Sequence, residues 1–132
     1  MGKSLIITEK PSVAQEFAKV LGVSGGRRDG YLENQKYVIT WCVGHLVAMV
    51  YPESYDIKYK KWKLEDLPFL PKEYKYDVIK DVSRQYDVVH GMLMREDIDR
   101  VYWAGDAGKE GQTIEENIRN FGGVRDLSLI HI

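Results

Sequence analysis

Apolar and polar residues follow one another near the N-terminus in the order typical of a strand, a turn and a helix. Residues 4–8 form a short β-branched run that predicts a buried strand. Polar residues then interrupt the run, and Pro11 is tolerated in a first helical turn. The apolar residues that follow have helical spacing: Val13, Phe17, Val20 and Leu21. We therefore expect an amphipathic helix that ends at Gly22.

The same order of elements returns at residues 101–121. A β-branched and aromatic run ends at Ala104 and leads into a turn rich in glycine. Beyond the turn, one helical face carries the apolar residues Ile114, Ile118 and Phe121. Glycines in the turn allow positive φ angles or a close approach to a phosphate: Gly105, Gly108 and Gly111. Open α/β sheets bind ligands at the carboxyl ends of their strands, so this turn is the leading candidate site.

Three carboxyl side chains lie in these two turns. Glu9 follows the first strand, and Asp106 and Glu110 are four residues apart in the second turn. If the two strands are neighbours in a parallel sheet, the three carboxylates converge and can reach one cation. Each residue also has a simpler interpretation. Glu9 is then a solvated turn residue or a helix-dipole partner, Asp106 is a helix N-cap, and Glu110 complements the helix dipole.

The segment after the first helix predicts a β-hairpin. Residues 31–33 and 37–42 have strand character and flank an Asn-Gln turn. A glycine-rich loop precedes the hairpin and carries Arg27 and Arg28. These arginines are either phosphate contacts or a solvated charge pair, and the second interpretation is simpler.

Residues 50–76 predict irregular structure rich in aromatic residues, proline and lysine. Lysines interleaved with aromatics are typical of a groove for single-stranded nucleic acid. The alternative is a loop whose aromatics pack on the sheet while its lysines stay in water. A short strand at residues 74–78 and a core-facing helix within residues 77–94 are expected to follow.

The chain contains one cysteine, Cys42, which excludes an internal disulfide and fits a reducing compartment. His45 follows three residues later, at a spacing that in principle allows a thiolate–imidazole pair. A metal site or a cysteine nucleophile is not expected, because neither a third ligand nor an orienting acid stands at a recognisable spacing.

Length and charge narrow the possible partners. A chain of 132 residues predicts one domain with a real core. The net charge of −1 gives no global field for nucleic acid or membranes, so any DNA contact must be local. No apolar run approaches the ~20 residues that span a bilayer, and the N-terminus has no signal-peptide core. We expect a cytoplasmic protein without a membrane partner.

Four ordered sequence blocks carry a resemblance to a known family. They are residues 5–14 (LIITEKPSVA), 40–46 (TWCVGHL), Trp62 with 67–71 (LPFLP), and 106–111 (DAGKEG). Together they resemble the N-terminal TOPRIM domain of type IA DNA topoisomerases, closest to the topoisomerase III group. The resemblance implies an α/β, Rossmann-like fold. Its mainly parallel sheet is expected to carry helices on both faces and an inserted β-hairpin.

The resemblance also implies roles for individual residues. Glu9 matches the family's acid–base glutamate beside the scissile phosphate, and Lys10 matches the lysine that contacts this phosphate. Asp106 and Glu110 match the outer acids of the Asp-x-Asp-x-Glu turn, which binds Mg²⁺, and Glu9 is expected to join them as a metal ligand. His45 matches a Gly-His pair, near DNA or in a structural hydrogen bond.

The acidic turn departs from the family pattern at three positions. Gly108 replaces the middle acid, Lys109 replaces the usual arginine, and Gln112 replaces a glutamate. A lost carboxylate is expected to weaken magnesium binding before abolishing it, because magnesium retains several waters and relies on few carboxylates. Lys109 keeps a positive charge near DNA but loses the two-pronged grip of arginine.

Type IA enzymes relax or decatenate DNA without ATP. A tyrosine cuts one strand, another strand passes through the gap, and the break is rejoined. In the family this tyrosine belongs to a later domain, so we expect the chain to be part of a longer topoisomerase whose other domains are its partners. Residues 123–132 are either a final strand or a non-native tail of a single domain covering residues 1–132.

Two other functions remain open from the sequence. The first is a non-catalytic TOPRIM module that binds nucleic acid or a partner, which Gly108 and Gln112 favour. The second is a different TOPRIM enzyme, such as a primase or a small nuclease. That interpretation leaves the blocks at residues 41–46 and 67–71 unexplained.

Overall fold

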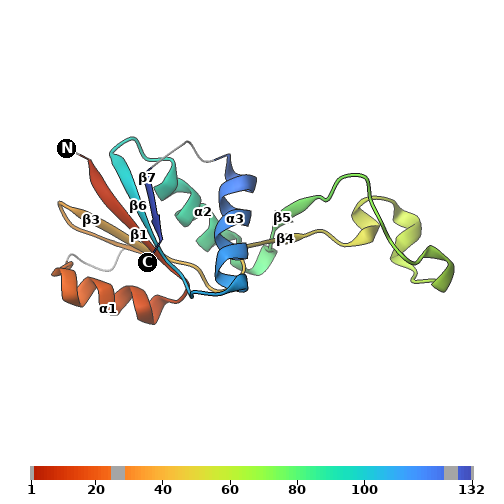
Figure 1. Ribbon diagram of the computed structural model, residues 1–132, viewed down its shortest axis with the longest axis horizontal. Helices are drawn as coiled ribbons and strands as arrows, with labels where there is room; N and C mark the ends of the chain where they lie inside the picture. Colours follow the sequence, from red (N-terminus) through yellow and green to blue (C-terminus); the bar gives the residue numbers. More distant parts are fainter. Residues whose placement is uncertain (1, 25–28, 124–127, 132) are drawn as a thin grey trace.

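A computed structural model of the protein describes residues 2–24, 29–123 and 128–131. Its centre is a five-stranded sheet in the order β2-β3-β1-β6-β7 (Figure 1). The strands are β1 (Lys3–Thr8), β2 (Tyr31–Glu33), β3 (Tyr37–Trp41), β6 (Ile98–Ala104) and β7 (Ser128–His131). All neighbours pair in parallel except β2 with β3. The predicted mainly parallel α/β fold is confirmed.

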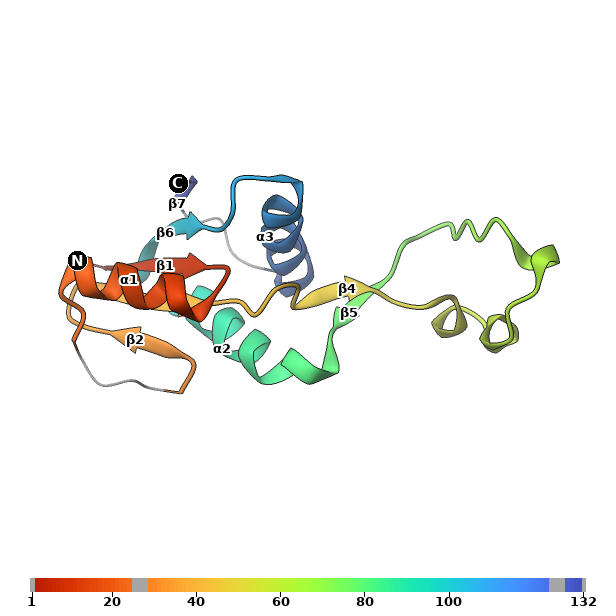
Figure 2. The same ribbon diagram turned by 90° about the horizontal axis from the view of Figure 1, so that it is seen from below.

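Helices cover both faces of this sheet. Helix α1 (Pro11–Leu21) packs on one face, whereas α2 (Ser83–Leu93) and α3 (Lys109–Gly122) pack on the other (Figures 1 and 2). Alternate residues of a strand point to opposite faces, and β1 divides its side chains accordingly. Leu5 and Ile7 join the core beneath α2 and α3, while Ile6 joins the core beneath α1. The first strand is therefore buried on both sides.

Helix α1 ends at Gly22 as predicted, with Gly22 in the left-handed conformation at a φ of 67°. Its buried face agrees with the prediction at Phe17 and Leu21, which pack against the core, and differs from it at the two valines. Val20 is 83% exposed and Val13 is 37% exposed, while Ala14 and Ala18 are buried against the sheet. The two alanines let the helix backbone approach the strands closely, and this close approach turns the valines toward water.

The predicted hairpin is present. Strands β2 and β3 pair antiparallel, and the Asn34 side chain closes their turn by accepting hydrogen bonds from the backbone N–H groups of Lys36 and Tyr37. Arg27 and Arg28 lie outside the described residues.

Residues 50–75 form an arm that extends away from the sheet (Figures 1 and 2). The arm leaves the body through the antiparallel pair β4 (Val47–Met49) and β5 (Tyr76–Val78). It contains three 3₁₀ turns: η1 (Pro52–Ser54), η2 (Ile57–Lys60) and η3 (Leu64–Asp66). The expected irregular structure is thus confirmed, but its aromatic rings pack on one another rather than on the sheet.

Helix α2 follows the arm after the 3₁₀ turn η4 (Lys80–Val82). The predicted core-facing stripe is confirmed at Tyr86, Val89 and Leu93, which are buried against the sheet. At the other end of the chain, β7 pairs with β6, so residues 128–131 form a strand of the central sheet. None of the described helices is both long enough and apolar enough to cross a membrane.

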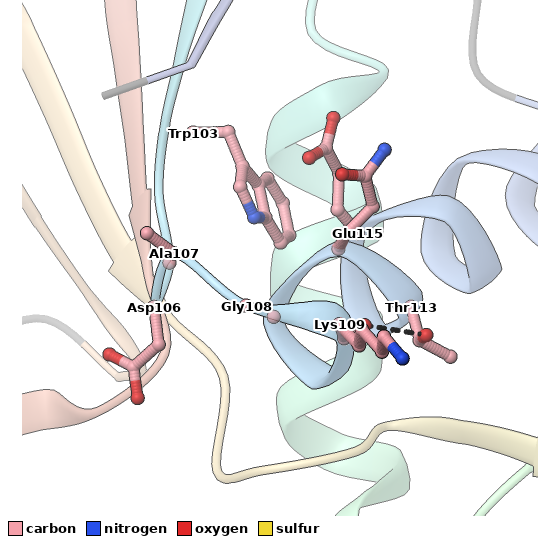
Figure 3. Close-up of a pocket in the computed structure, with 10 residues that line it drawn as sticks. Trp103, Asp106, Ala107, Gly108, Lys109, Thr113 and Glu115 are labelled. Atoms are coloured by element: carbon pink, nitrogen blue, oxygen red, sulfur yellow. Dashed lines mark hydrogen bonds between the residues drawn. The ribbon is translucent and has the colours of Figure 1, made fainter.

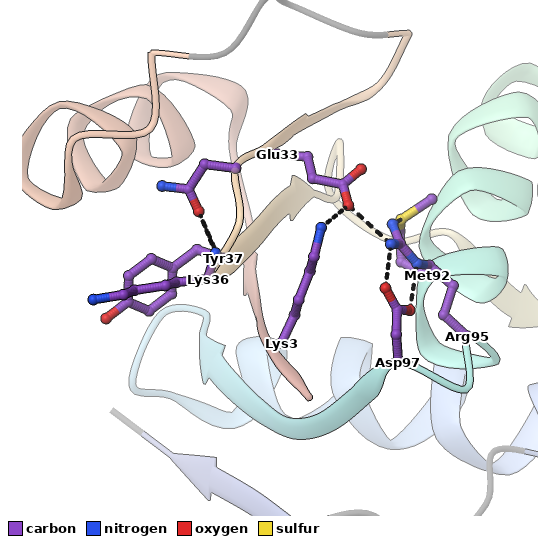
Figure 4. A network of polar contacts seen from close by, with 8 residues as sticks. Lys3, Glu33, Lys36, Tyr37, Met92, Arg95 and Asp97 are labelled. Atoms are coloured by element: carbon purple, nitrogen blue, oxygen red, sulfur yellow. Dashed lines mark hydrogen bonds and ion pairs between the residues drawn. The ribbon is translucent and has the colours of Figure 1, made fainter. Parts of the chain in front are cut away.

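An ionic network ties the amino-terminal end of the sheet together (Figure 4). The Lys3 ammonium donates to Oε2 of Glu33 at 2.6 Å, and the Arg95 guanidinium donates to the same oxygen at 2.8 Å. Arg95 also donates to Asp97 at 2.6 Å. The hydrogen bond from Arg95, together with that from Lys3, lowers the pKa of Glu33 to about 2 despite partial burial. This network joins β1, β2 and the turn before β6.

Candidate functional site

The two predicted turns meet at the carboxyl-terminal end of the sheet. Strands β1 and β6 are parallel neighbours in register, with Thr8 opposite Ala104, so Glu9 leaves the sheet beside Asp106. The first turn is fixed locally because the buried Thr8 hydroxyl donates to the Lys10 carbonyl at 2.9 Å. The premise that these strands are neighbours is therefore correct.

Glu9 and Asp106 form a pair of interacting carboxyl groups. A side-chain hydrogen bond with Asp106 raises the pKa of Glu9, and burial and the negative charge of Asp106 raise it further. The Asp106 backbone N–H and the Lys10 ammonium oppose this shift but do not cancel it. Oε2 of Glu9 is buried and has no hydrogen-bond partner among the described residues. The pair is short of positive charge.

The second turn brings the backbone of Gly111 close to the backbone of Asp106. A Cβ atom at this position would lie 2.0 Å from the Asp106 carbonyl oxygen, so no larger residue fits without moving the backbone. Gly108 has an extended φ of −167° and open space around it. Glycine is therefore needed at position 111, whereas position 108 accommodates a side chain.

Asp106 does not cap the following helix. The N-cap of α3 is Gly108, and no side chain caps it. The backbone closes the turn instead: the Gly108 N–H donates to the Asp106 carbonyl at 2.9 Å, and the Gln112 N–H donates to Gly108 at 3.1 Å. The N-cap interpretation of Asp106 is thus wrong, and its carboxylate is free to interact with Glu9.

Glu110 does not join the carboxyl pair. It lies in the first turn of α3, where its carboxylate is 87% exposed and 3.8 Å from Nε2 of His45. Among the residues that the structure describes, no group of three or more His, Cys, Asp or Glu residues is placed to hold a metal. The expected convergence of three carboxylates is wrong for Glu110, because α3 begins at Lys109 and directs Glu110 toward the loop after β3.

The two candidate lysines lie at the edges of the same site. Lys10 is exposed at the N-cap position of α1 and is close enough to Glu9 to lower its pKa. Lys109 is exposed at the first position of α3. Both ammonium groups therefore face solvent beside the acidic turn.

A cleft beside the pair contains two residues that the sequence analysis did not single out (Figure 3). The cleft has a volume of about 710 Å³, and Trp103 and Glu115 contribute to its lining. The Trp103 indole Nε1 is buried without a hydrogen-bond partner in the described parts of the chain. Glu115 is 1% exposed and lies 3.6 Å from Arg119. The sequence position of Glu115, next to Ile114 on the apolar stripe of the helix, could have indicated that this glutamate is buried.

Figure 3 shows that the Asp106 carboxylate points away from α3. Asp106 therefore belongs to the lining of the cleft, but its carboxylate is directed away from α3. Cys42 lies beneath the same end of the sheet, where burial, with a smaller contribution from the charge of Glu9, raises the pKa of its thiol to about 12. The thiol holds its proton at neutral pH.

Comparison with known proteins agrees with this geometry. The Toprim domain model matches residues 4–128. The chain is 50% identical over 114 residues to proteins named DNA topoisomerase 3 from Bacillus thuringiensis (strain Al Hakam) and Bacillus anthracis. It is 47% identical over 112 residues to the protein of that name from Staphylococcus haemolyticus.

These alignments cover 85–86% of the chain but 16% of each relative, so the chain spans about a sixth of their length. They confirm the resemblance to topoisomerase III that the four sequence blocks carry. The family match covers nearly the whole chain, from β1 to the start of β7, and includes both turns of the carboxyl pair. The chain belongs to the Toprim domain family.

Proposed function

We propose that the chain is the Toprim part of a type IA DNA topoisomerase, folded as a single domain over residues 1–132. The whole enzyme would relax or decatenate DNA without ATP by cutting one strand, passing a strand and rejoining the break. The observation that carries this proposal is the Glu9–Asp106 pair, which the neighbouring strands β1 and β6 bring together. The nucleophilic tyrosine lies outside this chain, so the chain alone does not cut DNA. Acting on DNA, the protein is proposed to be cytoplasmic.

The carboxyl pair fits a magnesium ion. Magnesium prefers oxygen ligands and is commonly held by one or two carboxylates together with waters and substrate phosphates. Glu9 and Asp106 supply two carboxylates whose mutual repulsion a cation relieves, and Oε2 of Glu9 lacks a donor. Glu110 lies beside His45 and is not among the proposed ligands. When bound, magnesium supplies positive charge that stabilises negative charge developing on phosphate oxygens.

The side chains around the pair would then divide the remaining work. Lys10 binds the scissile phosphate, and its ammonium stabilises the charge on the non-bridging oxygens. Glu9, whose pKa is raised before a cation binds, is proposed to donate a proton to the leaving 3′ oxygen and to recover it when the strand is rejoined. Lys109 and His45 contact the backbone of the bound single strand.

Magnesium binding is tested by the melting temperature of the chain. A ligand that binds only the folded state raises this temperature with concentration. We expect Mg²⁺ to raise it for the wild type and to have little effect on Asp106→Asn. The matched control is Asp81→Asn, since Asp81 is an exposed aspartate in η4 and should leave the magnesium response intact. Equal responses in both variants would refute the metal assignment.

DNA binding is tested with a labelled single-stranded oligonucleotide at several salt concentrations. Lys10→Ala should weaken binding and reduce the dependence of log K on log salt by about 0.7, the value for one phosphate contact on a single strand. Lys19→Ala is the control, because Lys19 is exposed in the last turn of the same helix. The phosphate role fails if both lysine variants bind DNA as the wild type does.

The non-catalytic Toprim module remains the second candidate, and two observations favour it. Position 108 carries no carboxylate although space for one is present, and Glu110 lies against His45 rather than with the pair. This candidate predicts DNA binding that does not depend on magnesium and is unchanged in Glu9→Gln. The topoisomerase proposal predicts magnesium binding that Glu9→Gln weakens.

A further inference from the structure

The arm formed by residues 50–75 carries a surface that the carboxyl pair does not use. Its internal packing is an aromatic cluster. Phe69 packs edge-on against Tyr55, with 5.2 Å between the ring centroids, and against Tyr59, with 5.0 Å between the ring centroids. The Tyr55 hydroxyl also accepts a hydrogen bond from the Lys75 backbone N–H at 2.5 Å. These contacts join the two sides of the arm and give it a defined shape away from the sheet (Figure 2).

Large apolar side chains remain outside this cluster. The exposed fractions are 78% for Trp62, 88% for Leu64, 54% for Leu67 and 74% for Leu70. The other two tryptophans of the chain, Trp41 and Trp103, are 8% and 6% exposed. Trp62 and Leu67 line one cleft, and exposed apolar side chains that lie together mark a binding site more often than singly exposed ones do. The arm therefore presents one solvent-exposed indole to a partner.

Trp62 forms part of a small cleft with aromatic walls. The cleft has a volume of about 160 Å³, and the rings of Tyr59 and Phe69 also line it. Lys61 and Lys63 belong to the same lining, together with one acidic residue, Asp66. Ring faces beside ammonium groups match the two parts of a nucleotide, because a base stacks on aromatic rings while its phosphate pairs with lysine.

The charge of this segment selects the kind of partner. Residues 57–64 contain four lysines and no acidic residue: Lys58, Lys60, Lys61 and Lys63. Within the described parts of the chain, Lys63 has Glu65 at 3.8 Å, and the other three have no acidic group within ion-pair distance. An apolar protein partner would remove these charges from water without compensation, whereas a polyanion neutralises them and releases counterions.

We propose that the arm is a second binding site for single-stranded nucleic acid, with a base stacked on Trp62 and phosphates held by Lys61 and Lys63. It is distinct from the carboxyl pair, since the arm extends from the body through β4 and β5 (Figure 1). The inference rests on the proposed function, in which a single strand is the substrate. In that setting the arm holds the strand away from the point of cleavage.

Tryptophan fluorescence provides a direct test. A short oligothymidylate is titrated into the intact chain at low salt, and a base stacked on Trp62 should quench its emission while the buried Trp41 and Trp103 stay constant. Trp62→Phe should abolish the quenching but retain binding, measured by the anisotropy of a labelled oligonucleotide. Trp62→Ala should weaken binding about tenfold, as expected for the loss of one stacked base.

The double variant Lys61→Ala/Lys63→Ala tests the phosphate contacts. It should reduce the salt dependence of log K by about 1.4, corresponding to two contacts on a single strand. The double variant Lys19→Ala/Lys36→Ala removes the same charge from exposed positions of the body and should have a smaller effect. All these side chains are exposed, so the variants should melt close to the wild type.

Three outcomes would overturn the arm proposal, and they are distinguishable. If DNA binds but only Lys10→Ala weakens it, the proposed function stands and the arm site is wrong. If Trp62 emission changes with protein concentration instead of DNA, the arm is a contact between copies of the chain. If no DNA binds, the arm site is wrong, and the magnesium response of the melting temperature decides separately on the carboxyl pair.

Discussion

The two ends of the central sheet place a glutamate in opposite electrostatic surroundings. At the amino-terminal end, Glu33 accepts hydrogen bonds from Lys3 and Arg95, and its pKa falls to about 2. At the carboxyl-terminal end, Glu9 shares a hydrogen bond with Asp106, and its pKa rises. The first arrangement stabilises the folded chain. The second stores repulsion that a cation or a proton relieves, as is common at functional sites.

Gly111→Ala should have the largest effect on stability of the substitutions proposed here, and it should disrupt the turn at the carboxyl-terminal end of the sheet. The new Cβ would meet the Asp106 carbonyl, and relieving this overlap should cost about 3 kcal/mol of unfolding free energy and move Asp106 from Glu9. Gly91→Ala in α2 is the matched control, since it has open space and should stabilise the helix by about 0.8 kcal/mol. Chemical denaturation measures the unfolding free energy of both variants. A change of the same sign in the two variants would contradict the close packing of Gly111 against Asp106.

Glu33→Gln should weaken the amino-terminal end by about 2 kcal/mol, because it removes charge-assisted hydrogen bonds to Lys3 and Arg95. The folded pKa of Glu33, about 2, lies below its ordinary value of 4.5. Its stabilisation is therefore complete above pH 4.5 and is lost as the pH falls toward 2. Denaturation between pH 6 and 2.5 should show the wild type converging on the variant. A constant difference over this range would count against the network.

Glu9→Gln should change the unfolding free energy in the opposite direction to Glu33→Gln and by a smaller amount. Because the folded pKa of Glu9 is raised, ionised Glu9 destabilises the folded chain at neutral pH, and its favourable contribution is present at low pH and lost as the pH rises. Gln keeps the shape and removes the repulsion from Asp106, so it should stabilise the chain by about 1 kcal/mol at pH 7. A destabilised variant at pH 7 would show that the two carboxyl groups do not repel one another.

Gly108→Asp should have the smallest effect on stability and should sharpen the functional contrast. The position is open and extended, so the substitution should change the unfolding free energy by less than about 0.5 kcal/mol without metal. A third carboxylate beside the pair should increase the rise in melting temperature that Mg²⁺ produces. Gly108→Asn is the uncharged control. The acidic turn is not the metal site if Asp and Asn give the same magnesium response.

The sequence predicted this contrast only in part. The strand–turn–helix pattern placed Glu9 and Asp106 at the ends of two parallel strands, and parallel neighbours necessarily bring such positions together. It did not place Glu110, because the residue at which a helix begins decides where its first-turn side chains point. The Glu33 network joins residues more than 60 positions apart, and no local pattern reports such a contact.

Two other errors have physical causes. Hydrophobicity alone assigned Val13 and Val20 to the buried face of α1, whereas close helix–sheet packing selected Ala14 and Ala18. The composition of residues 50–76 indicated irregular structure correctly. It could not predict that the arm extends away from the sheet, since aromatic rings are buried equally well against one another or against a sheet.

The most direct test is a carbon-13 NMR titration of the side-chain carboxyl groups of Glu9 and Glu33 in one sample, repeated with Mg²⁺. We predict that Glu33 titrates near pH 2 and Glu9 above its ordinary value of 4.5. Magnesium should lower the titration point of Glu9 and leave that of Glu33 unchanged. Both groups titrating near 4.5, or Glu9 not responding to magnesium, would contradict the assignment of the carboxyl-terminal end as a cation site.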